Sequence, residues 1–380
     1  MRQRGIILFL LVLLFGFASA YDWPTLQFLN FWPSARATGL AGCFTSIADD
    51  AYTAYYNPAG LPFLQKRMTA LTYNPYLTGY YPDMHYLNIS YSSPLKNNQG
   101  FGVFVPYFTN GCIEVYDENG NYLGEKCNYT FAIAGSYGNQ IRKTLSLGGT
   151  AKFIYYHGYY WEDWFGMFPP SAFVIPAGSG VGLAVDVGLL YKPISKFNLG
   201  FTIQNFGTKI DTSPYLWGYE DEFLSLPRLS RLGIKYGPLT KNKTKTLITA
   251  ELTKNLVGMF YDPYNTQTFF QELKYELKDI DRGIGLEFSA YDLVHLRIGY
   301  YEDVTNRTGG LLIAYYGRQE HVSICDYLFN GEIRGSKIYK VGLTYSVGIT
   351  YKNASVDIGT DQYLYDFDTA NWKFTLSYQF

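Results

Sequence analysis

Apolar and polar residues alternate along the last strand-length segment, and this period of two is the feature that most constrains the fold. The segment interleaves Trp372, Phe374, Leu376, Tyr378 and Phe380 with Lys373, Thr375, Ser377 and Gln379. Because successive side chains of a strand point to opposite faces, the pattern predicts a strand with one apolar face. The same period recurs in residues 181–191, 197–204 and 341–351.

The residues on the second face of these segments distinguish a soluble β-sandwich from a membrane β-barrel. In a soluble sandwich the apolar face is the core and the polar face meets water. Here the second face holds mainly Gly, Ser and Thr with few charges, which suits a crowded barrel lumen better. The mean hydropathy of −0.10 is too polar for a bundle of membrane helices. A β structure in lipid must also close, since lipid cannot satisfy an open strand edge.

The strand-like runs along the chain predict the number of strands. We expect strands near residues 68–79, 84–93, 99–109, 129–139, 144–158, 180–193, 196–208, 228–236, 244–254, 283–291, 294–302, 338–351, 353–363 and 371–380. Connections after even-numbered strands are short and most connections after odd-numbered strands are long, as periplasmic turns and outer loops produce. The sequence therefore predicts an all-β fold, a transmembrane antiparallel β-barrel of about 14 strands. A further strand-like run at 311–316 would raise the count if it joined the barrel.

The N-terminus reads as an export signal. Arg2 and Arg4 precede an apolar run at 6–17, and Ala18-Ser19-Ala20 forms a small-x-small cleavage site before Tyr21. The alternative is a single-span anchor, but the run is short for a membrane helix. No Cys follows the cleavage site, so a lipoprotein is not expected. We expect residues 1–20 to be a signal peptide and the chain to reach the outer membrane of a Gram-negative-type bacterium.

Charge gives no indication of a nucleic-acid partner. The chain has 31 basic and 32 acidic residues and no Lys/Arg run. The four His residues are scattered and no CxxC occurs, so neither a metal nor another cofactor is expected.

The cysteines predict one disulfide. Cys112 and Cys127 flank a polar turn at 117–121, and an exported chain folds in an oxidising compartment. Cys43 and Cys325 have no obvious partners.

One long connection has a helical period. Phe269, Phe270, Leu273, Leu277 and Ile280 recur at helical spacing among charged residues. We expect a short amphipathic helix in an extracellular loop. Packing on neighbouring loops is favoured over binding of a partner.

Residues 34–64 are rich in small residues, lack strand alternation and end in the turn signature Asn57-Pro58-Ala59-Gly60. Such a segment can pack inside a barrel. It resembles the N-terminal hatch of the FadL-type transporter superfamily, and more closely its PorV/PorQ branch. The matching residues are Arg36, Ala37, Gly39, Gly42, Ala48, Asp49, Asp50, Asn57, Pro58, Ala59, Gly60 and Leu61. Together with the export signal at 1–20, the resemblance implies a hatch at 21–66 and a barrel at 67–380.

A second match lies further along the chain. Gly285-Leu286-Glu287-Phe288, followed by Leu296-Arg297-Ile298-Gly299-Tyr300, looks like a strand pair of PorV-like proteins. Cys43 departs from the small residue usual in the family, and Phe288 replaces a Tyr. The resemblance also implies that Tyr378 and Phe380 signal to the barrel-assembly machinery, although they could simply be girdle aromatics.

Alternation places a set of ionisable side chains in the lumen. A charge facing lipid near the midplane would cost roughly 2–4 kcal/mol, so inward placement is nearly forced. They either pair with one another and with the hatch, which we favour, or form a polar path or ligand clamp. The set is Lys152, Arg231, Lys235, Glu251, Glu287, His295 and Arg297.

Function is expected to be non-enzymatic, since no catalytic constellation stands at a strand end. The closer branch implies action with a type IX secretion translocon and its cargo, in protein export or attachment at the outer membrane. Aromatic-rich loops at 159–173 and 215–223 favour protein contacts. The alternative is a hatch-gated uptake channel for long-chain fatty acids or other hydrophobic small molecules.

Overall fold

The computed structural model describes residues 26–78, 83–116, 119–158, 178–212, 223–259, 268–303, 308–315, 318–365, 369 and 371–380. The predicted signal peptide and most of the two aromatic-rich loops lie outside these ranges. Within them no helix has the length and apolarity to cross a membrane.

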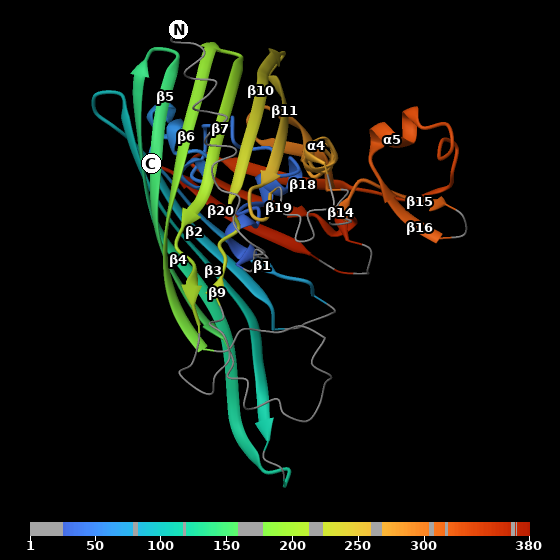
Figure 1. Cartoon of the computed structure of the whole chain (residues 1–380). Coiled ribbons are helices and arrows are strands. Elements are labelled where there is room, and N and C mark those ends of the chain that lie inside the picture. The colour runs from blue at the N-terminus through green and yellow to red at the C-terminus, as the bar shows by residue number, and fades with distance from the viewer. Residues whose placement is uncertain are drawn as a thin grey trace.

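Fourteen strands of the described chain form a closed antiparallel barrel (Figure 1). They are β1 (Met68–Pro75), β2 (His85–Leu95), β3 (Gln99–Tyr116), β4 (Tyr122–Arg142), β5 (Leu145–Gly158), β6 (Gly178–Ile194), β7 (Phe197–Gly207), β10 (Leu229–Lys241), β11 (Thr244–Asn255), β12 (Asp281–Ala290), β13 (Val294–Asp303), β18 (Leu343–Tyr351), β19 (Ala354–Thr360) and β20 (Trp372–Gln379). Each pairs with the next along the chain, and β20 pairs with β1 to close the ring. The prediction of an antiparallel barrel of about 14 strands is confirmed.

Alternation along the strands separates a lipid face from a lumen face. On β12, Ile284, Leu286 and Phe288 are exposed, whereas Gly283, Gly285 and Glu287 between them are buried. The same holds around the ring, so that large apolar side chains cover the outside of the barrel. A belt of this extent is unsuited to water and is typical of a surface that faces lipid.

Tight hairpins close one end of the barrel. Three of the turns place two consecutive residues at positive φ, at Asn97-Asn98, Asn242-Lys243 and Tyr291-Asp292. Two such residues form the turn whose twist matches paired strands. The backbone N–H of Phe380 donates to the carbonyl of Arg67 at this same end. We call it the short-turn end, and the opposite rim the long-loop end.

The long-loop end carries a separate small sheet. β15 (Leu311–Tyr315) pairs with β16 (Arg318–Val322) and β17 (Ile338–Val341), and α5 (Ile324–Phe329) lies beside them, to the right in Figure 1. The run at 311–316 therefore adds no barrel strand. The strand predicted at 338–351 is divided, because its first residues join this sheet and only β18 joins the barrel. α5 was not predicted, since six residues are too few to show a helical period.

The remaining elements are short. They are η1 (Gln27–Asn30), α2 (Ala35–Gly39), α3 (Thr53–Tyr56), η2 (Pro58–Phe63), β8 (Ile210–Asp211), β9 (Phe223–Leu224), α4 (Phe269–Lys278), β14 (Thr308–Gly309) and η4 (Gln362–Leu364). The helical segment expected in a long connection corresponds to α4.

Residues 26–66, which we call the inner segment, lie within the ring of strands (Figure 1, blue). Inward-facing glycines on the wall meet it at many points. The glycines at 138, 148 and 188 lie against Asn57–Pro58, and a Cβ added to Gly285 would stand 2.8–2.9 Å from atoms of Leu40. The segment fits because the wall has no side chains at these places.

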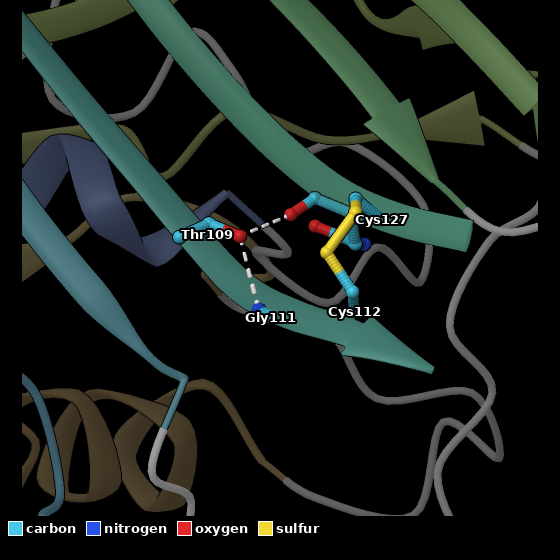
Figure 2. The surroundings of a disulfide bond; sticks show 5 residues. Thr109, Gly111, Cys112 and Cys127 are labelled. Carbon is cyan, nitrogen blue, oxygen red and sulfur yellow. Dashed lines mark hydrogen bonds between the residues drawn. A yellow bond between two sulfur atoms is a disulfide. The ribbon is translucent and has the colours of Figure 1, made fainter. Parts of the chain in front are cut away.

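A disulfide joins Cys112 to Cys127 across the long β3–β4 hairpin (Figure 2). The predicted pair is thus formed, while Cys43 is buried and Cys325 exposed, both as free thiols. A bulge lies beside the disulfide at Gly111, whose φ is +91°. Thr109 Oγ1 accepts from the Gly111 N–H at 3.0 Å and donates to the Asn128 carbonyl at 2.6 Å.

We predict that Gly285→Ala lowers barrel stability by about 1–3 kcal/mol, because the new methyl group overpacks against Leu40. The measurement is the midpoint of thermal unfolding of the purified protein in detergent. The matched control is Gly135→Ala on the outer face, where an added Cβ meets nothing within 4 Å. Equal midpoints for the two variants would show that the inner segment does not press on this wall.

Candidate functional site

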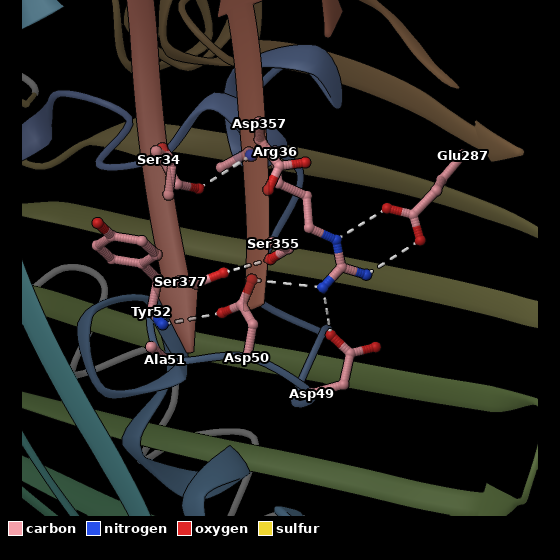
Figure 3. Close-up of polar contacts among 12 residues, drawn as sticks. Ser34, Arg36, Asp49, Asp50, Ala51, Tyr52, Glu287, Ser355, Asp357 and Ser377 are labelled. Carbon is pink, nitrogen blue, oxygen red and sulfur yellow. Dashed lines mark hydrogen bonds and ion pairs between the residues drawn. The ribbon is translucent and has the colours of Figure 1, made fainter. Parts of the chain in front are cut away.

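The largest convergence of charge in the lumen is built around Arg36. Ser34 accepts the Ala37 N–H at 3.1 Å and so begins α2, which carries Arg36 toward the wall. Arg36 Nη1 lies 2.6 Å from Asp49 Oδ1 and 3.4 Å from Asp50 Oδ2. Nε and Nη2 donate to the two carboxylate oxygens of Glu287 on β12, at 2.8 and 3.1 Å (Figure 3). This bidentate pairing fixes the orientation of both groups.

A second arginine extends the network along the wall. Arg297 stands opposite Glu287 in the β12–β13 register, and its Nε donates to Glu287 Oε2 at 2.6 Å. Its Nη1 reaches Asp357 Oδ1 on β19, also at 2.6 Å. Lys235 Nζ lies 3.8 Å from Asp49 Oδ2. Three cations therefore face four carboxylates, and Glu287 joins the inner segment to the wall.

Asp357 was not among the candidate residues. Its place could have been found from the alternation of β19, because Val356 and Ile358 on either side face outward. Because β19 is short, its alternation is a weak signal.

The other predicted charges form smaller groups. Lys152 Nζ lies 2.8 Å from Asp186 Oδ2 and 2.6 Å from Asn205 Oδ1. Arg231 Nη1 lies 3.2 Å from Glu251 Oε1, and the other oxygen of Glu251 accepts the N–H of Thr45 at 2.9 Å.

His295 is within hydrogen-bond distance of Ser289 and Thr350, at 2.8 and 2.9 Å. The seven predicted lumen residues thus all have partners on the wall or the inner segment, and the structure does not bring them together at one place.

The remaining motif residues shape the inner segment. Asn57 Nδ2 donates to the carbonyls of Thr45 and Leu189, and its Oδ1 accepts from Ala59. Pro58, Ala59 and Gly60 continue as η2, and Gly42 turns the chain with φ +74° against Trp32. Gly39 lies against Ser346 of β18. Tyr378 and Phe380 are exposed, with ring centroids 5.1 Å apart.

Two cavities lie on opposite sides of the inner segment. One of about 330 Å³ is lined by the Arg36 network and by turn residues such as Asp292. The other, of about 430 Å³, is lined by Trp32, Asp281, Tyr301 and Asp303 near the long-loop end. Within the described residues, no group of three or more His, Cys, Asp or Glu could hold a metal ion.

The two adjacent aspartates of the inner segment differ in acidity. Burial, acting against the attraction of Arg36, raises the pKa of Asp50 from 3.8 to about 7. Burial also opposes ionisation of Asp49, but Arg36 and Lys235 hold the pKa of Asp49 below its ordinary value. Asp50 therefore titrates near neutral pH at a contact between α2 and the chain that follows.

Comparisons with known proteins agree with this architecture. Residues 24–158 match the model of the family described as "Type IX secretion system protein PorV". A crystal structure of the toluene transporter TodX of Pseudomonas putida has a TM-score of 0.52 at 12% identity, covering 95% of this chain and 99% of that one. A second TodX crystal structure gives 0.50 at 9% identity, covering 91% and 98%. At such identities the likeness concerns the fold.

No curated protein matches the chain in sequence. The family model thus agrees over residues 24–158 with the PorV-type resemblance that the hatch motif indicated, and the fold of the whole chain resembles that of TodX.

We predict that Arg36→Ala loosens the inner segment. It removes one of the two arginines that pair with buried Glu287. Because Arg297 remains, we expect a cost below the roughly 3–5 kcal/mol of leaving a buried charge without a partner. Hydrogen exchange of residues 34–64 in the purified protein measures this, with faster exchange expected. The control is Lys245→Ala, whose partner Asp292 is 67% exposed and whose ion pair is worth less than about 1 kcal/mol. Unchanged exchange in Arg36→Ala would contradict a docking role for the network.

We predict that Asp50→Asn removes part of the pH dependence of stability. Because the folded pKa is raised, native Asp50 binds its proton more tightly than in the unfolded chain, so its contribution is complete below about pH 4 and is lost as pH rises toward 7. The neutral variant should therefore gain stability relative to the native protein as pH rises across this window. Thermal midpoints measured from pH 4 to 8 test this, and parallel curves would refute it.

Proposed function

We propose that this chain, an outer-membrane β-barrel of the PorV family and FadL type, acts in protein export and attachment at the outer membrane and has no catalytic activity. The observation that carries the proposal is the matched region, residues 24–158, which comprises the inner segment and β1 to β5. The family described for this region is a type IX secretion system protein.

The contacts inside the barrel argue against a channel wide enough for a folded protein. The inner segment is bonded to the wall from several sides, through Asn57 to β6, Glu251 to Thr45, and Glu287 to Arg36. A folded polypeptide would have to displace all of these contacts. We therefore infer that cargo is handled at the long-loop end, outside the lumen.

Exposed apolar side chains support a partner surface there. On α5, Phe329 is 86% exposed and Leu328 is 52% exposed. Aromatic residues are enriched where proteins meet. The small sheet of β15, β16 and β17, with α5 beside it, stands apart from the barrel wall, so it is accessible to a soluble domain (Figure 1).

We propose further that residues 1–20 direct export and are removed, and that Tyr378 and Phe380 are read by the barrel-assembly machinery. The exposure of both rings beside the β1–β20 closure supports this.

Affinity purification of the chain from outer membranes tests the export role. We predict co-purification of secretion translocon subunits and cargo proteins, and a severalfold loss of cargo when Leu328 and Phe329 are both replaced by Ser, since the apolar contact is lost. Tyr291→Ser is the control, because Tyr291 is 69% exposed at the short-turn end. Absence of translocon and cargo from the native preparation would overturn the proposal.

A second candidate is uptake of long-chain fatty acids or other hydrophobic small molecules. The shared fold with TodX, which is described as a toluene transporter, favours it. Vesicles containing the purified barrel would then accumulate a labelled fatty acid faster than empty vesicles, and Arg36→Ala would change that rate. Uptake equal to that of empty vesicles would exclude this candidate.

A further inference from the structure

The helix α4 exposes most of its large apolar side chains and buries an acidic one. Phe270 is 79% exposed and Leu277 is 57% exposed, whereas Glu276 is only 8% exposed. With 100° of rotation per residue, Phe269, Phe270, Leu273 and Leu277 fall within one arc of about 100°. Leu273 in this arc is half-buried, whereas Phe270 and Leu277, at the edge of the arc far from Glu276, point away from the protein. This part of the apolar face does not pack on neighbouring loops.

The polar side of α4 attaches it to the outside of the barrel. Lys254, near the end of β11, follows Ile248 and Leu252 on the outer face of that strand. Lys254 Nζ lies 2.5 Å from Glu276 Oε2 and 2.6 Å from Asp279 Oδ2, and donates to the Asp279 carbonyl at 3.0 Å. Since Lys254 points away from the lumen, its ion pairs hold the C-terminal end of α4 at the outer side of the rim.

The exposed face of α4 continues the apolar belt of the barrel. The neighbouring strands β11 and β12 present Leu252, 45% exposed, and Ile284, 56% exposed, near the rim to which Lys254 ties the helix. Belt residues of this kind face lipid in a membrane barrel. A helix fixed at the rim beside them stands at the level where acyl chains meet headgroups.

The charge on α4 suits that level. Lys274 and Lys278 follow Phe270 and Leu277 around the helix and border one edge of the apolar arc. A helix with an apolar face and adjacent lysines is typical of segments that lie in the plane of a membrane interface, and the lysines attract anionic headgroups.

We propose that α4 is an interfacial helix embedded in the outer leaflet of the membrane. Phe270 and Leu277 enter the boundary between headgroups and acyl chains, and Lys274 and Lys278 contact anionic lipid headgroups. The Lys254 ion pairs hold the helix to the wall, so that the lipid contact extends beyond the strands at this side of the barrel. The inference depends on the membrane barrel and is independent of the export role.

Site-directed spin labelling of the full chain tests the proposal. Cys325→Ser removes the exposed thiol, and Cys43 is buried. Single labels are then placed by Phe270→Cys or Leu277→Cys, with Tyr275→Cys as the matched control, because Tyr275 is 59% exposed on the opposite side of α4. The protein is reconstituted in vesicles of phosphatidylcholine and phosphatidylglycerol. Collision rates with oxygen, which concentrates in lipid, and with a water-soluble nickel chelate are measured.

The oxygen-to-nickel ratio is expected to be severalfold higher at positions 270 and 277 than at 275. Replacing Lys274 and Lys278 by Glu should lower the ratio at 270 in these anionic vesicles. Equal, water-like ratios at all three positions would overturn the membrane assignment, and a ratio at 270 that is insensitive to the charge reversal would overturn the headgroup contact.

Discussion

The pairing of β1 with β20 is the contact on which the architecture depends. Residues 68–73 register against 374–379, and this ladder converts a twisted sheet into a ring in which neighbouring strands satisfy one another's backbone groups. Closure also divides the strand side chains into those that point outward and those that point into the lumen. Outward positions carry Ile, Leu, Val and aromatic residues, and inward positions meet the inner segment.

The enclosed volume explains the buried charges. Paired ions in a protein interior are costly to desolvate and become favourable when geometry and hydrogen bonds compensate. Glu287 accepts hydrogen bonds from two arginines. Glu251 accepts them from Arg231 and from a backbone N–H, so each carboxylate has more than one donor. These contacts determine where the inner segment sits, and they leave separate cavities on its two sides.

Much of this arrangement could be predicted from the sequence because alternation is a local signal. The barrel, its strand count and the inward placement of Lys152, Arg231 and Glu287 all follow from a period of two. The convergence of Arg36, Glu287 and Asp357 could not be predicted in the same way, since it depends on strand register and on contacts between residues separated by up to 251 positions (287 − 36). The small β15–β17 sheet was missed for a related reason, because short runs in a long connection do not reveal which sheet they join.

The glycines of the inner wall have an evolutionary consequence. The contacts of Gly285 with Leu40, of Gly188 with Asn57 and of Gly359 with Ala35 each join distant parts of the chain. A larger residue on the wall can be accommodated only by a smaller or shifted partner in the inner segment. Such positions are expected to covary among homologues, and a segment taken from a relative should fit only when its own wall residues are transferred with it.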